Sequence, residues 1–96
     1  DQRRGVRGTV GRMATPEELE AAAKRVNALP SSPGTSDMLE LYALYKQSTV
    51  GDVNIARPGI FDVRGRAKWD AWSGKKGTPP EGARTAYVAL AKRLGA

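Results

Sequence analysis

The chain contains neither cysteine nor histidine. Their absence excludes disulfides, thiolate nucleophiles and the Ser-His or Cys-His pairs of many hydrolases, together with nearly all zinc and haem sites. Carboxylates, lysines, tyrosines and hydroxyls are the side chains left for acid–base or nucleophilic chemistry. We therefore expect a binding protein without metal or cofactor, rather than an enzyme.

Long apolar runs are missing as well. No stretch approaches the roughly 18 uninterrupted apolar residues of a membrane-spanning helix, and the N-terminus lacks the apolar region of a signal peptide. The expected location is therefore the cytoplasm. The chain begins at Asp1 rather than at a methionine, so a processed protein and a domain excised from a larger enzyme both stay open.

The formal charge of +6 is unevenly distributed along the 96 residues. Residues 1–12 carry four arginines and one aspartate, residues 13–63 carry four basic and seven acidic groups, and residues 64–96 carry eight basic and two acidic groups. This asymmetry favours a local anion site over a uniformly basic surface. A basic helical module that binds nucleic acid through residues 1–12 and 64–96 is the alternative.

Helical start and stop signals divide the chain into four segments with no strand pattern. Residues 1–12 are Gly- and Arg-rich without an apolar period, which predicts a flexible arm. A helix-start signal begins at Thr15 and again at Thr78: each threonine is a candidate cap and is followed by a first-turn proline and an acidic residue. Further helices are expected at about 36–50, ended by Gly51, and at about 65–76. The sequence predicts an all-α four-helix bundle over residues 13–96.

Apolar periodicity identifies the faces that should pack. One stripe of the first helix and one of the last recur at helical spacing. They consist of Leu19, Ala23, Val26 and Leu29, and of Ala83, Tyr87, Leu90, Ala91 and Leu94. Trp69 and Trp72 are expected in the core, whereas Lys75 and Lys76 are expected to face water.

The helix at 36–50 has more apolar surface than a small core needs. Leu41, Leu44 and Ser48 lie on one side, and only Glu40 and Gln47 form a clearly polar strip. The other side carries Met38, Leu39, Tyr42, Tyr45 and Lys46. A second apolar face on one helix predicts that one face packs while the other lines a cavity.

Three ordered blocks follow within this region: "YALYKQSTVGDVN", "RPG" and "GRAKWDAW". Together they resemble the acyl-CoA-binding protein family, also called the diazepam-binding inhibitor family, over residues 15–94. The resemblance implies a four-helix bundle that binds long-chain acyl-CoA thioesters without transforming them, as a monomeric carrier or buffer. It makes residues 13–96 the acyl-CoA-binding domain, with acyl-CoA-using enzymes and membrane surfaces as transient partners.

The resemblance also assigns the ligand site. It implies that Lys46 and Lys68 hold the 3′-phosphate of the adenosine, while the tyrosines pack and hydrogen-bond around the head group and thioester. Arg64 replaces a frequent lysine, so a phosphate contact and a solvated charge are both open there. A helix-one position that is often lysine in the family is Asn27 here. The implied ligand-binding set is Tyr42, Tyr45, Lys46, Lys68, Tyr87, Met38, Leu39 and Arg64.

The physical chemistry of such a ligand agrees with these residue types. Coenzyme A is a polyanion, so each lysine that meets a phosphate in a partly dry groove contributes about 1.5–3 kcal/mol. Tyrosine rings offer a flat apolar wall, and each buried methylene of an acyl tail contributes about 0.8 kcal/mol. The head group would set specificity and the tail would set strength. A thioesterase or isomerase is the weakest of the alternatives.

Overall fold

The computed structural model describes residues 13–96 and contains four helices in this part of the chain. They are α2 (Pro16–Asn27), α3 (Thr35–Thr49), α4 (Val63–Ser73) and α5 (Pro80–Arg93). The predicted all-α bundle is therefore confirmed, whereas the predicted arm at residues 1–12 lies outside the described residues. None of the described helices combines the length and hydrophobicity needed to cross a membrane.

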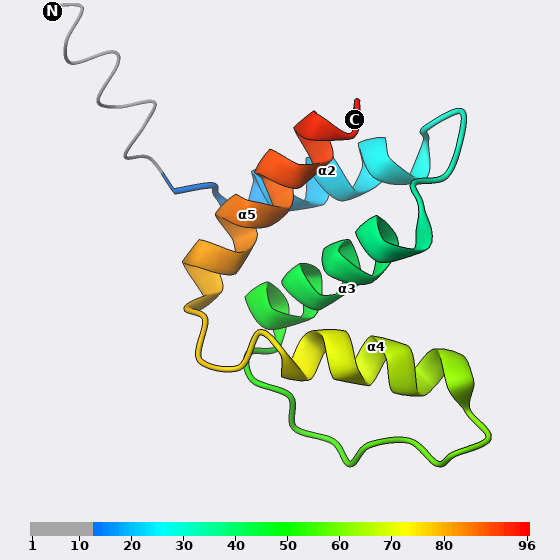
Figure 1. The fold of residues 1–96 in the computed structure, drawn as a ribbon. Coiled ribbons are helices and arrows are strands. Elements are labelled where there is room, and N and C mark those ends of the chain that lie inside the picture. Colours follow the sequence, from blue (N-terminus) through cyan, green and yellow to red (C-terminus); the bar gives the residue numbers. More distant parts are fainter. Residues whose placement is uncertain (1–12) are drawn as a thin grey trace, which may run out of the picture.

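Helix α3 is the centre of the bundle (Figure 1). It packs against α4 on one side and against α5 on the other, and α2 packs against α5. The backbones of α2 and α3 do not approach each other closely, although both contact α5. This arrangement leaves a space between the backbones of α2 and α3, and side chains of both helices line it.

Helix α2 begins as its sequence predicts. The Thr15 side chain accepts a hydrogen bond from the Glu18 backbone, and the Glu18 carboxylate accepts one from the Thr15 backbone, which completes a capping box. The helix ends at Asn27, three residues before Pro30. Ala22 is fully buried, whereas Ala23 is only half-buried, so the stripe is rotated slightly from its predicted position.

The polar strip predicted for α3 is wrong at Gln47. This residue is 1% exposed because α4 and the segment leading into α5 cover it. Its side-chain amide donates to Asp52 Oδ1 at 2.8 Å and to the Thr78 carbonyl at 2.9 Å. Gly51 ends the helix as predicted, with a positive φ of 99° that favours glycine. Gln47 therefore joins three separate segments from inside the protein.

Helix α4 is displaced towards the N-terminus relative to its prediction. Asp62 caps it by accepting from the Gly65 backbone at 3.0 Å, so the helix starts at Val63 and ends at Ser73. Gly65 makes this cap possible, because a Cβ there would lie 2.2 Å from Asp62 Oδ2. Beyond the helix, half-buried Lys75 forms an ion pair with Glu40, so the prediction that it faces water is wrong.

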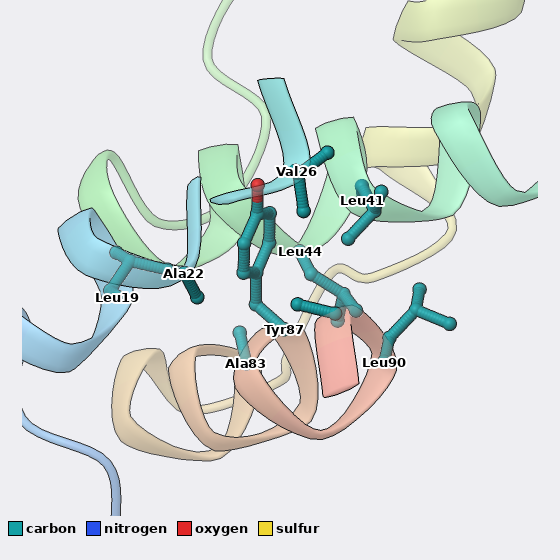
Figure 2. Packing of buried hydrophobic residues seen from close by; sticks show 9 residues of the cluster. Leu19, Ala22, Val26, Leu41, Leu44, Ala83, Tyr87 and Leu90 are labelled. Atoms are coloured by element: carbon teal, nitrogen blue, oxygen red, sulfur yellow. The ribbon is translucent and has the colours of Figure 1, made fainter. Parts of the chain in front are cut away.

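Helix α5 starts one residue later than predicted. Pro79 rather than Thr78 occupies the cap position, and no side chain caps the helix. The predicted stripe is otherwise confirmed, with Leu94 half-buried at its end. Figure 2 shows how this stripe meets α2 and α3, with the Tyr87 ring rising from α5 between them. The buried cluster consists of Leu19, Ala22, Val26, Leu41, Leu44, Ala83, Tyr87, Leu90 and Ala91.

Candidate ligand-binding groove

A groove of about 370 Å³ occupies the space between α2 and α3. Its volume lies at the lower end of the range for small-molecule sites. Tyr87, only 5% exposed, reaches it from α5, because its ring lies between the two helices (Figure 2). The lining combines apolar and aromatic side chains with three polar ones at the α2 edge. It consists of Glu20, Ala23, Lys24, Val26, Asn27, Met38, Leu41, Tyr42, Tyr45 and Tyr87.

Two of the lining tyrosines form one network with an acid of α2. The Tyr45 hydroxyl donates to Glu20 Oε2 at 2.9 Å, which bridges α3 and α2. The rings of Tyr45 and Tyr87 meet edge to face, with centroids 5.9 Å apart. The bond to Glu20, followed by burial, raises the pKa of Tyr45, and burial is the main cause that raises the pKa of Tyr87. Both hydroxyls therefore stay protonated donors at neutral pH.

Tyr42 connects the groove to a cation of α4. Its ring lines the groove, and Lys68 Nζ lies 5.5 Å from the ring centroid. Lys46, one turn after Tyr42 on α3, places its Nζ 5.0 Å from the centroid of the Trp72 ring. The two lysines assigned to phosphate binding thus both lie on the α3–α4 side, each over an aromatic face.

The two tryptophans of α4 attach the connection between α3 and α4 to this helix. Trp72 is 2% exposed, and its indole N–H donates to the Gly51 carbonyl at 2.8 Å. Its predicted core position is confirmed. Trp69 is half-buried, and its indole N–H donates to the Ile55 carbonyl at 2.7 Å. The long connection between α3 and α4 is therefore attached to α4 at two points.

Not every residue of the predicted set lies at the groove. Four of its members line the groove: Met38, Tyr42, Tyr45 and Tyr87. Lys46 and Lys68 are not among the lining residues and lie over the rings of Trp72 and Tyr42. Half-buried Leu39 and exposed Arg64 are not among the lining residues. Their assignment to the ligand site stays a prediction, as does that of the whole set.

Sequence reasoning missed Glu20 and Lys24 of α2, and it named Asn27 only as a departure from a lysine that is frequent in the family. Glu20, Lys24 and Asn27 line the groove although the family blocks contain none of them. Their spacing of four and three residues places them on one helical face, which was the signal available in the sequence. Periodicity does not show which helix lies opposite that face, so the signal could not be read alone.

The arrangement suits an amphiphile with an anionic end. An apolar, aromatic groove can shield an aliphatic chain from water, and the lysines beyond Tyr42 offer donors to phosphates. Among residues 13–96, no group of three His, Cys, Asp or Glu side chains is placed to hold a metal ion.

Comparison with known proteins places this fold and groove in a family. The family described as "Acyl CoA binding protein" matches residues 16–91. The chain is 52% identical over 76 residues to the acyl-CoA-binding protein of Saccharomyces cerevisiae, covering 79% of this chain and 87% of the relative. It is 48% identical over 82 residues to that of Gossypium hirsutum, covering 85% and 92%.

The architecture agrees with the sequence match. The crystal structure of Oryza sativa acyl-CoA-binding protein 2 superimposes with a TM-score of 0.77 at 45% identity, covering 81% of this chain and 87% of that one. The matched range covers α2, α3 and α4 in full and α5 up to Ala91, and it includes every residue of the groove lining. The chain belongs to the acyl-CoA-binding protein family.

Proposed function

We propose that the chain binds long-chain acyl-CoA thioesters as a non-catalytic carrier. The observation that carries this proposal is an aromatic groove with two lysines beside it: Lys68 lies over the ring of the lining residue Tyr42, and Lys46, one turn after Tyr42, lies over Trp72. The acyl tail would lie in the groove, and the phosphates would meet the two lysines. Family membership supports the same ligand, since the relatives are named for acyl-CoA binding.

The resting positions of the lysines favour exchange for a phosphate. A cation over an aromatic ring gains about 0.5–1 kcal/mol at an exposed site and about 2 kcal/mol when desolvated, whereas a charge-assisted hydrogen bond contributes about 1.5–3 kcal/mol. Lys68 is exposed and Lys46 is half-buried, so water and ligand reach both. The aromatic rings keep the ammonium groups close to the groove until a phosphate takes the place of the rings as their partner.

The tail supplies most of the affinity in this proposal. Each buried methylene contributes about 0.8 kcal/mol, so a chain of many methylenes outweighs a few phosphate contacts. The hydroxyls of Tyr45 and Tyr87, held in protonated form, are hydrogen-bonding groups of the groove lining, and Tyr45 already donates its proton to Glu20. They would orient the ligand at the junction between tail and head group.

Calorimetric titration tests the proposal with three ligands. Palmitoyl-CoA should bind far more tightly than free coenzyme A, because only the thioester fills the groove. Palmitate alone should bind negligibly, because it lacks the phosphates that the lysines hold. Equal binding of palmitate and palmitoyl-CoA would contradict the carrier function.

The finer parts of the proposal concern the setting in which the protein works. We place a monomeric carrier in the cytoplasm, where it exchanges ligand with acyl-CoA-using enzymes and membrane surfaces. Such partners are expected because a long-chain acyl-CoA is an amphiphile that partitions into bilayers. The comparisons do not support the nucleic-acid-binding alternative.

A further inference from the structure

The connection between α3 and α4 exposes large apolar side chains at a sharp turn. The backbone N–H of Asp62 donates to the Gly59 carbonyl at 3.0 Å, which closes a turn with Ile60 and Phe61 as its two central residues. Ile60 is 71% exposed and Phe61 is 96% exposed, and Val63, immediately after the turn, is 73% exposed. Central turn positions normally carry glycine, proline or short polar residues. We call Ile60, Phe61 and Val63 the apolar turn.

The apolar turn is held rigidly although it projects from the bundle. Asp62 both closes the turn and caps α4. Earlier in the connection, Arg57 forms a two-point ion pair with Asp70 of α4, with both nitrogen–oxygen distances 2.9 Å. The connection runs outside α4 in Figure 1. A partner of the apolar turn would therefore meet side chains that are already in position, with little ordering cost.

The ligand groove does not explain the apolar turn. Every lining residue of the groove belongs to α2, α3 or α5, and none lies between residues 51 and 79. The turn also holds the only phenylalanine of the chain, nearly all of it exposed. The groove lining therefore leaves the exposure of these side chains unexplained.

The surrounding charge selects the kind of partner. Residues 55–68 contain four basic groups and one acidic group, Asp62, whose carboxylate is engaged in the helix cap. Arg64, next to the apolar turn, and Lys68, one turn further on α4, are both exposed. Apolar side chains flanked by arginine and lysine are the composition that binds anionic bilayers, with the apolar part entering the headgroup region.

The size of the apolar turn disfavours a protein partner. Phe61 supplies about 150–250 Å², and the smaller, partly exposed Ile60 and Val63 keep the turn below about 600 Å² in all. Specific protein interfaces bury about 800 Å² on each partner. A second copy of this chain would in addition bring two basic surfaces together. A lipid surface has no such area requirement, because a few inserted side chains suffice for weak, reversible binding.

We propose that the apolar turn and its flanking basic residues form a docking surface for anionic membranes that lies outside the groove lining and shares Arg64 and Lys68 with the predicted ligand set. Phe61 and Ile60 enter the headgroup region while Arg64 contacts anionic lipid. The inference deepens the carrier function and depends on it only for its purpose, which is to bring the groove to a source of acyl-CoA. Binding to lipid itself needs no acyl-CoA.

Vesicle sedimentation of the full chain tests this proposal without acyl-CoA. The probes are vesicles of phosphatidylcholine alone and of phosphatidylcholine with phosphatidylglycerol at 7:3. We expect measurable binding to the anionic vesicles that falls as salt is raised, and much weaker binding to the neutral ones. Phe61→Ser should weaken the anionic binding about tenfold, the factor expected for losing one partly buried aromatic side chain.

Controls separate the docking surface from folding and from the groove. Val50→Ser removes another exposed apolar side chain outside the turn and should leave vesicle binding unchanged. Phe61→Ser should keep the wild-type affinity for palmitoyl-CoA in calorimetry, so failure of docking and failure of ligand binding are read in different experiments. Equal vesicle binding by wild type and Phe61→Ser would overturn the proposal. So would a concentration-dependent dimer that Phe61→Ser abolishes, which would assign the turn to a second copy.

Discussion

Polar groups have different partners on the two sides of α3. On the side facing α2 and α5, the hydroxyl of Tyr45 is bonded to Glu20, and the other lining atoms are largely apolar. On the side facing α4, Lys46 and Lys68 lie over aromatic rings. Helix α3 thus carries one wall of the groove, while the cations on its other side come from α3 itself (Lys46) and from α4 (Lys68). Under the proposed function, this difference assigns the acyl tail and the head group to separable parts of the protein.

Among the variants that test this difference between the two sides of α3, Trp72→Ala should have the largest effect, a loss of stability. The side chain is 2% exposed, lies between α3 and α4, and carries the ring beneath Lys46. Its removal should lower the free energy of unfolding by about 3–5 kcal/mol, measured by urea denaturation. Half-buried Trp69→Ala is the matched control and should cost clearly less. Equal losses would show that Trp72 is not the main contact between the two helices.

The head-group side is tested next by Lys46→Ala. Loss of one charge-assisted hydrogen bond to phosphate should weaken palmitoyl-CoA binding by about 1.5–3 kcal/mol in calorimetry. The urea unfolding curve should change little, because the lysine rests on the surface of Trp72 rather than inside the core. Lys92→Ala, exposed at the end of α5, is the charge-matched control. An unchanged affinity for Lys46→Ala would remove this lysine from the site.

A smaller effect on ligand affinity is expected when a cation is added at the α2 edge of the groove. Asn27 lies at the α2 edge of the groove and is exposed. Asn27→Lys should strengthen palmitoyl-CoA binding by about 0.2–1 kcal/mol, the range for exposed charge pairs, and the gain should shrink at high salt. Asn27→Gln controls for side-chain length without charge. A gain that is independent of salt would rule out an electrostatic cause.

The smallest expected effect concerns an acid on the α4 side. Asp52 accepts from the Gly77 backbone at 2.9 Å and from the Gln47 amide, and these bonds, the Gly77 one foremost, lower the pKa of its carboxyl. A lowered folded pKa means that ionised Asp52 stabilises the protein above the unfolded pKa of about 3.9. This contribution is lost as pH falls through the folded value.

Unfolding of Asp52→Asn across pH measures that contribution. The wild type should be more stable than the variant at pH 6, and the two should converge as pH drops below the folded pKa of Asp52. The asparagine keeps an acceptor for the same two donors, so the comparison isolates the charge. A stability difference that does not change with pH would contradict the role of the ionised carboxylate.

Local signals in the sequence predicted most of the bundle. The Thr15 capping box, the Gly51 stop and the stripe through Tyr87 all depend on neighbours a few residues away, so each could be read directly. Gln47 and Lys75 were predicted wrongly because their environment depends on which helix covers them. A glutamine on α3 appears solvent-facing until α4 and the segment before α5 enclose it.

The sequence likewise predicted part of the candidate site, namely one of its two walls. The spare apolar face of α3 indicated a cavity, and three of its aromatic and apolar residues do line the groove. The opposite wall could not be predicted, because nothing in the α2 sequence specifies that Glu20 meets Tyr45 across the gap. The gap itself arises because α2 and α3 both pack on α5 without contacting each other closely.

Titration with acyl-CoA esters of increasing chain length tests the central claim most directly. If the tail lies in the groove and the phosphates meet the lysines, affinity should rise steadily from octanoyl- through dodecanoyl- to palmitoyl-CoA. The increment should approach the value for burying methylenes until the groove is filled. Equal affinities for the three esters and free coenzyme A would contradict the account, because the groove would then contribute nothing to binding.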